Sequence, residues 1–277
     1  MKNFELTYIP DRSEKPRNKG VTMVMDKGLS LRQVEDFISS SGHLCDVVKF
    51  GFGTSYVTKN LQEKINLYKS ADIRPYFGGT LFEAFHARGM TEDYLRLLDK
   101  YNLDLCEVSD GSIILDHNEK CELINRFSKD RTVMSEVGSK DSGIIVSPAK
   151  WVRMMSTELE AGSWKVIAEG RESGTVGVFR PNGTAHTLLI NRIISKVKPE
   201  DILWEAPIKK QQAWFVKLFG PEVNLGNIAP HELIPLETLR LGLRGDTFFD
   251  FMPADYAERL KQVNDEDAEL ELEDEEE

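Results

Sequence analysis

The sequence has few of the residues that define disulfide-rich or zinc-binding proteins. Its three cysteines, Cys45, Cys106 and Cys121, include no CxxC pair, so we expect reduced, partly buried thiols rather than a disulfide framework. The five histidines are scattered and form no HxH or HExxH motif. A zinc site is therefore not expected.

Long apolar runs are missing as well. No run approaches the roughly 20 apolar residues that a membrane-spanning helix needs. The N-terminal segment MKNFELTYIPDRSEKPRNKG is polar and lacks the apolar core of a signal peptide. We therefore expect a cytoplasmic protein that does not insert into a membrane.

The chain also has no excess of basic residues. Its net charge is −11, and residues 264–277 hold ten acidic residues and no basic one, so removing them leaves −1 for the rest. A nearly neutral body does not favour binding to nucleic acid. We predict one folded domain over residues 1–260 and a disordered acidic tail over 261–277, which acts as a solubilising tail or docks to a basic partner.

What the chain does contain is a regular alternation of two kinds of segment. Eight short apolar runs have the β-branched composition of buried strands, and they lie at 20–26, 46–53, 73–80, 103–107, 132–136, 165–169, 202–205 and 223–228. Helix-like stretches separate them, at 31–40, 59–71, 91–101, 118–129, 148–162, 184–197, 210–220 and 231–243. This alternation predicts an α/β protein with parallel strands and right-handed crossovers. Eight such units favour a single (β/α)₈ TIM barrel, and an open, doubly wound sheet is the alternative.

Four successive strand-like runs end in a glutamate: Glu107, Glu136, Glu169 and Glu205. In a (β/α)₈ barrel the active site lies at the C-terminal ends of the strands, so these carboxylates should converge on one mouth. Like charges there raise one another's pKa unless a cation intervenes, and Mg²⁺ suits carboxylate oxygens. Each glutamate taken singly could instead pair with a neighbouring Lys or Arg.

Polar residues of the same rim are candidates for binding an anionic substrate. Lys49 could meet a carboxylate or phosphate, or form a structural ion pair. Arg171 offers a bidentate fork, or a salt bridge to Glu172 or Glu205. Phosphate groups in such barrels often bind at the loops after strands seven and eight, and this position nominates Lys209, the NLGN backbone that begins at Asn224, and Arg244.

Two glycines precede a hydroxyl residue and an acid in the segment GGTLFE (78–83). Backbone N–H groups in such a loop can hold anionic oxygens. The segment could equally be a turn from a strand into a helix that Thr80 caps.

Nine ordered segments together resemble the phosphosulfolactate synthase family. They are DKG (26–28), KFGFGTS (49–55), GGTLFE (78–83), EVSDG (107–111), SEVGSK (135–140), EGRESG (169–174), EAPIKKQQ (205–212), NLGNIA (224–229) and LETLRLGLRGDT (236–247). The resemblance extends over residues 4–248 and leaves the acidic tail outside it. It implies a (β/α)₈ barrel that adds sulfite to phosphoenolpyruvate with Mg²⁺, a C–S bond-forming lyase activity. In methanogens this reaction begins one route to coenzyme M, and in other bacteria it leads to sulfolactate.

The resemblance implies a role for one residue, and the chemistry of the reaction suggests roles for the others. The family's proposed general acid falls on Lys140, preceded here by Ser139 where the family often has a second lysine. Mg²⁺ is expected on Glu107, Glu136 and Glu169. Lys49, Arg171, Lys209 and Arg244 are expected to hold the substrates' anionic groups. Glu205, close to Lys209, is expected to pair with a rim cation.

Two other functions remain open from the sequence. Plant heat-stress-associated proteins are similar in sequence, so the chain could be a non-catalytic barrel that binds partners. It could also be another Mg²⁺-dependent enzyme that acts on phosphoenolpyruvate or an enolate. A homo-oligomer is compatible with the sequence.

Overall fold

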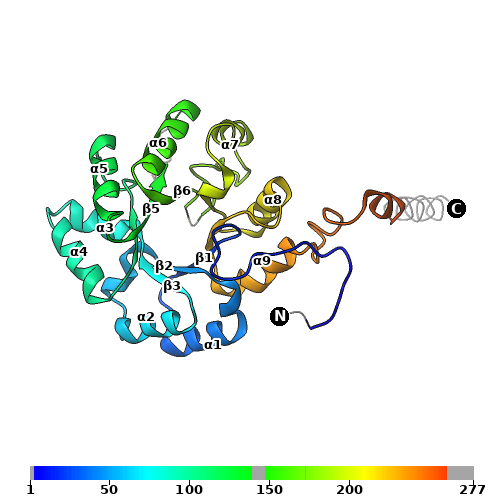
Figure 1. The fold of residues 1–277 in the computed structure, drawn as a ribbon, viewed down its shortest axis with the longest axis horizontal. Helices are drawn as coiled ribbons and strands as arrows, with labels where there is room; N and C mark the ends of the chain where they lie inside the picture. Colours follow the sequence, from blue (N-terminus) through cyan, green and yellow to red (C-terminus); the bar gives the residue numbers. More distant parts are fainter. Residues whose placement is uncertain (1–2, 139–146, 172, 261–277) are drawn as a thin grey trace.

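The computed structural model describes residues 3–138, 147–171 and 173–260, and in this part of the chain helices surround a set of parallel strands (Figure 1). The strands are β1 (Thr22–Asp26), β2 (Val47–Phe50), β3 (Arg74–Phe77), β4 (Leu105–Val108), β5 (Thr132–Val137), β6 (Ser163–Ala168), β7 (Ile202–Glu205) and β8 (Leu225–Ile228). The helices are α1 (Leu31–Ser41), α2 (Leu61–Ser70), α3 (Gly79–His86), α4 (Thr91–Lys100), α5 (His117–Phe127), α6 (Pro148–Glu160), α7 (Thr187–Ile194), α8 (Lys209–Phe219) and α9 (Leu233–Arg240).

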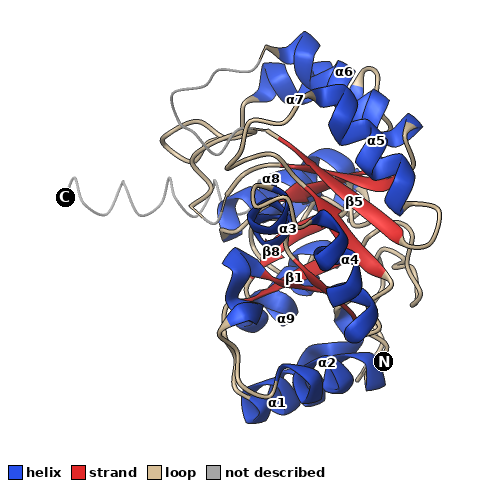
Figure 2. Cartoon of the chain, turned by 90° about the vertical axis from the view of Figure 1, so that its left-hand side faces the viewer, coloured by secondary structure: helices blue, strands red, loops and turns tan. Residues whose placement is uncertain are grey.

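The strand order closes the sheet into a barrel. It runs β3-β2-β1-β8-β7-β6-β5-β4, and every ladder is parallel. The first strand pairs with the last, and the two strands at the ends of this order, β3 and β4, lie in contact. Figure 2 shows the strands in the middle, with α5, α6 and α7 on one side and α1 and α2 on the opposite side. The predicted (β/α)₈ barrel is confirmed, and the alternative of an open sheet is excluded.

Local signals explain where several helices begin. Ser30 caps α1 through a capping box with Gln33, and Ser147 caps α6, whose first turn contains Pro148. Each helix of the predicted alternation is present, and an additional helix, α3, begins in GGTLFE, where a helix capped by Thr80 was one of two alternatives. The glycine pair of GGTLFE belongs to this extra helix, with Gly78 as its N-cap and Gly79 as its first residue. This segment is therefore a strand-to-helix turn.

The barrel interior is built in two layers. Its lower layer is an apolar cluster with Met23, Tyr76 and Leu105 among its members. Because side chains alternate along a strand, the residue two positions further on also points inward. For five strands that next residue is charged, although Glu169 lies one position past the end of β6. The pairs of apolar and charged residues are Val47 and Lys49, Leu105 and Glu107, Met134 and Glu136, Ile167 and Glu169, and Leu203 and Glu205. Each predicted glutamate therefore lies next to the apolar cluster inside the barrel, on the side of the C-terminal ends of the strands, which we call the mouth.

The opposite end of the barrel is crossed by the N-terminal segment. Arg12 pairs with Glu222 and Glu237, both at 2.9 Å, and Arg17 pairs with Asp46 at 3.0 Å.

Among the residues that the structure describes, no helix combines the length and apolar character needed to cross a bilayer. The predicted acidic tail, 261–277, lies outside the described residues.

Candidate active site

Lys49 lies at the centre of the charged layer. Its Nζ is 3.1 Å from Oε2 of Glu107, 3.4 Å from Oε2 of Glu136 and 3.5 Å from Oε1 of Glu205. The Lys49 side chain is 8% exposed, and the three carboxylates are 4% exposed or less. Lys49 is thus a buried cation that contacts three of the four predicted glutamates.

Burial and charge shift the pKa values of this cluster in opposing ways. Burial alone would lower the pKa of Lys49, but the negative charges around it, led by Glu107, outweigh burial and raise that pKa well above its ordinary value. Burial, with the nearby charge of Glu136, raises the pKa of Glu205 although Lys49 opposes the shift. Lys49 therefore stays protonated and keeps a dense group of acids inside the barrel.

Glu107 is bound on both oxygens by the protein itself. Tyr76 donates its hydroxyl hydrogen to Oε2 (2.8 Å), and the backbone N–H of Gly79 donates to Oε1 (2.7 Å). Gly79 allows this contact, because a Cβ there would lie 2.5 Å from Oε1. The N–H group considered for a substrate anion thus holds Glu107. The structure gives Glu107 the geometry of a fixed partner of Lys49.

The carboxylates that come closest together are those of Glu136 in β5, Glu169 directly after β6 and Glu205 at the end of β7, and these three strands are neighbours in the sheet. One oxygen of each lies within 4.8 Å of the others, and all three residues are buried. Oxygen ligands of an octahedral Mg²⁺ lie about 3–4 Å apart, so small side-chain shifts would let this group hold the ion. The set differs from the expected one, because Glu205 takes the place of Glu107.

A second buried lysine, Lys120 of α5, contacts the backbone of Glu136, one of these three glutamates. Its Nζ donates to the backbone oxygen of Glu136 (2.6 Å), pairs with Asp110 and also lies 2.9 Å from Glu158. Lys120 was not predicted as a site residue. The sequence pattern of a helix does not show that one of its lysines points toward the barrel and is buried there. The contact fixes the end of β5 where Glu136 projects.

The glutamates open onto a cavity of about 290 Å³, which we call the glutamate cavity. Its wall includes Lys49, Glu136, Glu169, Arg171 and Glu205. Arg171 has a positive φ of 54°, and its backbone N–H donates to Oε1 of Glu169 (2.7 Å). The predicted Arg171 therefore lines the same space as the acids.

Other predicted rim residues lie elsewhere. Lys209 pairs with Asp246 at 2.7 Å, and Nε of Arg244 is 3.9 Å from the same oxygen. Because Lys209 begins α8 directly after β7, this contact places Asp246 on the mouth side. Neither basic residue lines the glutamate cavity. Lys140, the predicted general acid, lies outside the described residues.

Asn224 requires a correction, because the structure places it at the end of the barrel away from the mouth. It precedes β8, its Oδ1 accepts from the N–H of Val21 (3.0 Å), and its Nδ2 donates to the oxygens of Glu200 (2.8 Å) and Ile202 (3.0 Å). These bonds join the starts of β1, β7 and β8. The asparagine of NLGN that reaches the mouth is Asn227, which lines the glutamate cavity.

We expect Asn224→Ala to lower the free energy of unfolding by about 1–3 kcal/mol, since it leaves buried backbone groups without partners. KM values should stay at the wild-type level, because the side chain does not reach the mouth. Urea denaturation and steady-state kinetics measure the two effects. A raised KM with unchanged stability would contradict this placement.

Comparison with known proteins identifies the family. Residues 10–246 match the sequence model described as (2R)-phospho-3-sulfolactate synthase. The phosphosulfolactate synthase of Bacillus subtilis is 40% identical over 252 residues, which cover 90% of this chain and 100% of that protein. The phosphosulfolactate synthase of Methanothermobacter thermautotrophicus is 39% identical over 244 residues, covering 86% and 95%.

Solved structures show the same fold at low sequence identity. The 3-hexulose-6-phosphate synthase of Salmonella typhimurium superposes with a TM-score of 0.54 at 14% identity, and the match covers 81% of this chain and 100% of that one. The 3-keto-L-gulonate-6-phosphate decarboxylase of Vibrio cholerae gives 0.52 at 11% identity, covering 85% and 100%. These likenesses concern the barrel alone. On the near full-length sequence matches, the chain belongs to the (2R)-phospho-3-sulfolactate synthase family and is an enzyme, a lyase that forms a C–S bond.

Proposed function

We propose that this enzyme adds sulfite to phosphoenolpyruvate and forms (2R)-phospho-3-sulfolactate. The observation that carries the proposal is the match of residues 10–246 to the synthase family. The buried cluster of Lys49 with Glu107, Glu136 and Glu205 at the mouth supports it, because a small, highly charged substrate needs a pre-arranged polar site.

The chemistry needs no protein nucleophile, since sulfite is itself one. Its sulfur forms a bond to the methylene carbon of phosphoenolpyruvate, and the electron pair of the double bond moves toward the carboxylate. The adjacent carbon then takes a proton from one face, for which the resemblance nominates Lys140. Arg171, in the wall of the glutamate cavity, is placed to bind an anionic oxygen of the substrate.

We also propose that Glu136, Glu169 and Glu205 hold Mg²⁺, since their oxygens approach within 4.8 Å. An ion bound there would supply positive charge beside the carboxylate on which negative charge develops. Lys49 would keep Glu136 and Glu205 in position through its contacts with both.

The proposed reaction is tested by incubating the protein with phosphoenolpyruvate, sulfite and Mg²⁺ and analysing the products by mass spectrometry. We expect phosphosulfolactate that depends on all three components. Consumption of phosphoenolpyruvate without sulfite would instead indicate another enolate enzyme. An absence of any turnover would favour a non-catalytic barrel.

Glu169→Gln tests the proposed ion site. Replacing a charged ligand with an amide should raise the Mg²⁺ concentration needed for half-maximal activity by about 10-fold or more. Asp246→Asn is the matched control, because it removes one carboxylate that pairs with Lys209 outside the glutamate cavity. A titration of activity with Mg²⁺ gives the concentration needed for half-maximal activity in each variant, and calorimetry gives the Kd for Mg²⁺. Equal Mg²⁺ dependence in the two variants would reject the assignment.

A further inference from the structure

Asn227 is a buried polar residue whose side chain has no hydrogen-bond partner among the residues that the structure describes. It is 6% exposed, and its Oδ1 is shielded from solvent without a partner. Its backbone has a φ of 57°, a left-handed conformation that non-glycine residues adopt at a cost. Asn224, three residues earlier, has the same type of side chain, and that side chain forms three hydrogen bonds. Two unfavourable features at one position of the mouth point to a ligand that compensates for them.

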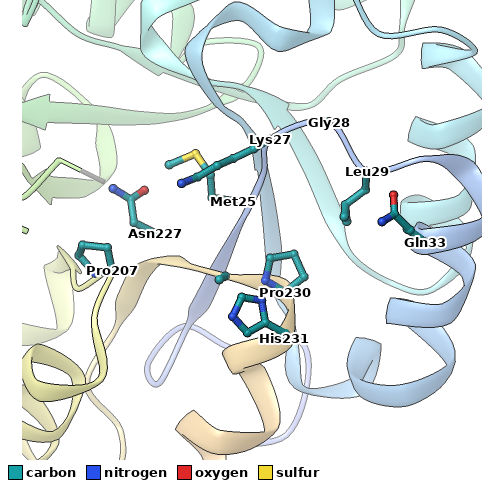
Figure 3. Close-up of a pocket in the computed structure, with 10 residues that line it drawn as sticks. Met25, Lys27, Gly28, Leu29, Gln33, Pro207, Asn227, Pro230 and His231 are labelled. Atoms are coloured by element: carbon teal, nitrogen blue, oxygen red, sulfur yellow. The ribbon is translucent and has the colours of Figure 1, made fainter. Parts of the chain in front are cut away.

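Asn227 stands where two cavities adjoin. It and Met25 line both the glutamate cavity and a neighbouring cavity of about 410 Å³, which we call the β1–β8 cavity. The lining of the β1–β8 cavity includes Lys27 after β1, and Pro230 and His231 after β8 (Figure 3). In Figure 3 the amino group of Lys27 and the carboxamide of Asn227 extend toward one another. A ligand that spans both cavities would pass the Asn227 side chain.

The two cavities differ in charge. Three glutamates line the glutamate cavity, whereas among the residues that the structure describes the ionisable side chains lining the β1–β8 cavity are Lys27 and His231. The nearby Asp26 is already bound, because Lys64 lies 3.1 Å from one oxygen and the N–H groups of Gly28 and Leu29 donate to the other. The β1–β8 cavity therefore suits the more strongly anionic end of a ligand.

Building on the proposed function, we propose that the phosphoryl group of the substrate binds in the β1–β8 cavity between Lys27 and Asn227, and that Asn227 is a specificity-determining residue. The carboxamide donates through Nδ2 to a phosphoryl oxygen, and a 180° turn of the group can present either end to the cavity. The carboxylate end of the substrate then enters the glutamate cavity. This places the phosphoryl group away from Lys209 and Arg244, which pair with Asp246.

Asn227→Gly is the sharpest test, because glycine accepts a positive φ without strain and the variant should fold. We expect the KM for phosphoenolpyruvate and the Kd for inorganic phosphate, measured by calorimetry, to rise about 10-fold or more, as for loss of a hydrogen bond to a charged group. The KM for sulfite should change less than about 2-fold. Lys27→Met should give the same pattern, and Lys209→Met should leave phosphate binding unchanged.

The outcomes separate this inference from the proposed reaction. If the wild type makes product and Asn227→Gly keeps its KM for phosphoenolpyruvate, the inference is overturned and the reaction stands. If the wild type makes no product but binds phosphate in a manner that needs Lys27 and Asn227, the reaction is rejected and the phosphoryl site is supported. Loss of phosphate binding in Lys209→Met alone, or no phosphate binding by the wild type, would also overturn the inference.

Discussion

Lys49→Met is expected to lower the free energy of unfolding by about 3–5 kcal/mol at neutral pH, the usual effect of removing one partner from a buried ion pair. Methionine keeps the length of the side chain but leaves Glu107, Glu136 and Glu205 without the cation that lies within 3.5 Å of each. Activity should be lost with stability, since the same carboxylates line the mouth. Urea denaturation in the presence of a chelator measures the effect without metal.

The stability deficit of Lys49→Met should depend on pH. Burial raises the pKa of Glu205 above its ordinary value of 4.5, and in the variant Lys49 no longer opposes this shift. A carboxyl whose pKa is raised by folding stabilises the fold below its unfolded pKa, and this contribution disappears as the pH rises through the folded value. The deficit should therefore be smallest near pH 4.5 and grow toward neutral pH.

Lys209→Met is the matched control for this experiment. Lys209 also contacts a carboxylate, at 2.7 Å, but its side chain is 43% exposed, and such pairs contribute about 0–1 kcal/mol. Adding Glu107→Gln to Lys49→Met should recover part of the lost stability, because it removes one uncompensated acid. Equal stabilities of Lys49→Met and Lys209→Met would show that the buried cluster does not depend on its cation.

Lys140→Ala is expected to lower kcat by about 10²–10⁴-fold, the usual contribution of a general acid, while phosphate still binds. The expectation rests on the proposed reaction, in which this lysine protonates the carbon next to the new C–S bond. Single-turnover kinetics with mass spectrometry would measure the rate of product formation. Calorimetry with inorganic phosphate would show whether binding is intact.

Lys150→Ala provides a control for Lys140→Ala, since Lys150 is exposed in the first turn of α6. It should leave kcat at the wild-type level. A reaction in deuterated solvent adds a readout of protonation, because the product then carries deuterium at the protonated carbon. If the acid is missing, the configuration at that carbon should become less pure. Near-normal turnover by Lys140→Ala would reject its assignment as the acid.

The barrel was predictable because its signals are local. A buried parallel strand is a short apolar run, and Ser30 and Ser147 mark helix starts through their own side chains. The helix α3 was only one of two alternatives for its segment, because it follows β3 after a single residue, Gly78, and its glycine pair is also typical of a loop. The sequence therefore predicts the eight strands and the helices of the regular alternation, but it does not settle the extra helix that begins at the glycine pair.

The detailed site was less predictable because it depends on register and on contacts across the barrel. Glu107 and Glu205 both end apolar runs, but Glu107 pairs in register with Met134 and is held by Tyr76. Both contacts involve residues of other strands, so the sequence around Glu107 does not reveal them. Asn224 and Asn227 belong to one short motif, yet Asn224 precedes the four-residue strand β8 and Asn227 is the third residue of that strand. A difference of three positions therefore places one side chain in structural hydrogen bonds at the start of the strand and the other at the mouth.

The pairing of β1 with β8 also has a consequence for how the chain reaches its native state. The first strand finds its second neighbour only after residues 225–228 are available, and the Arg12–Glu237 contact joins groups 225 residues apart. Contacts this remote in sequence form slowly, because a long segment must be ordered before they contribute. During synthesis on the ribosome, β1 therefore remains an unpaired edge on one side until the last strand arrives. This makes barrel closure a late event and exposes that edge to aggregation in the interval.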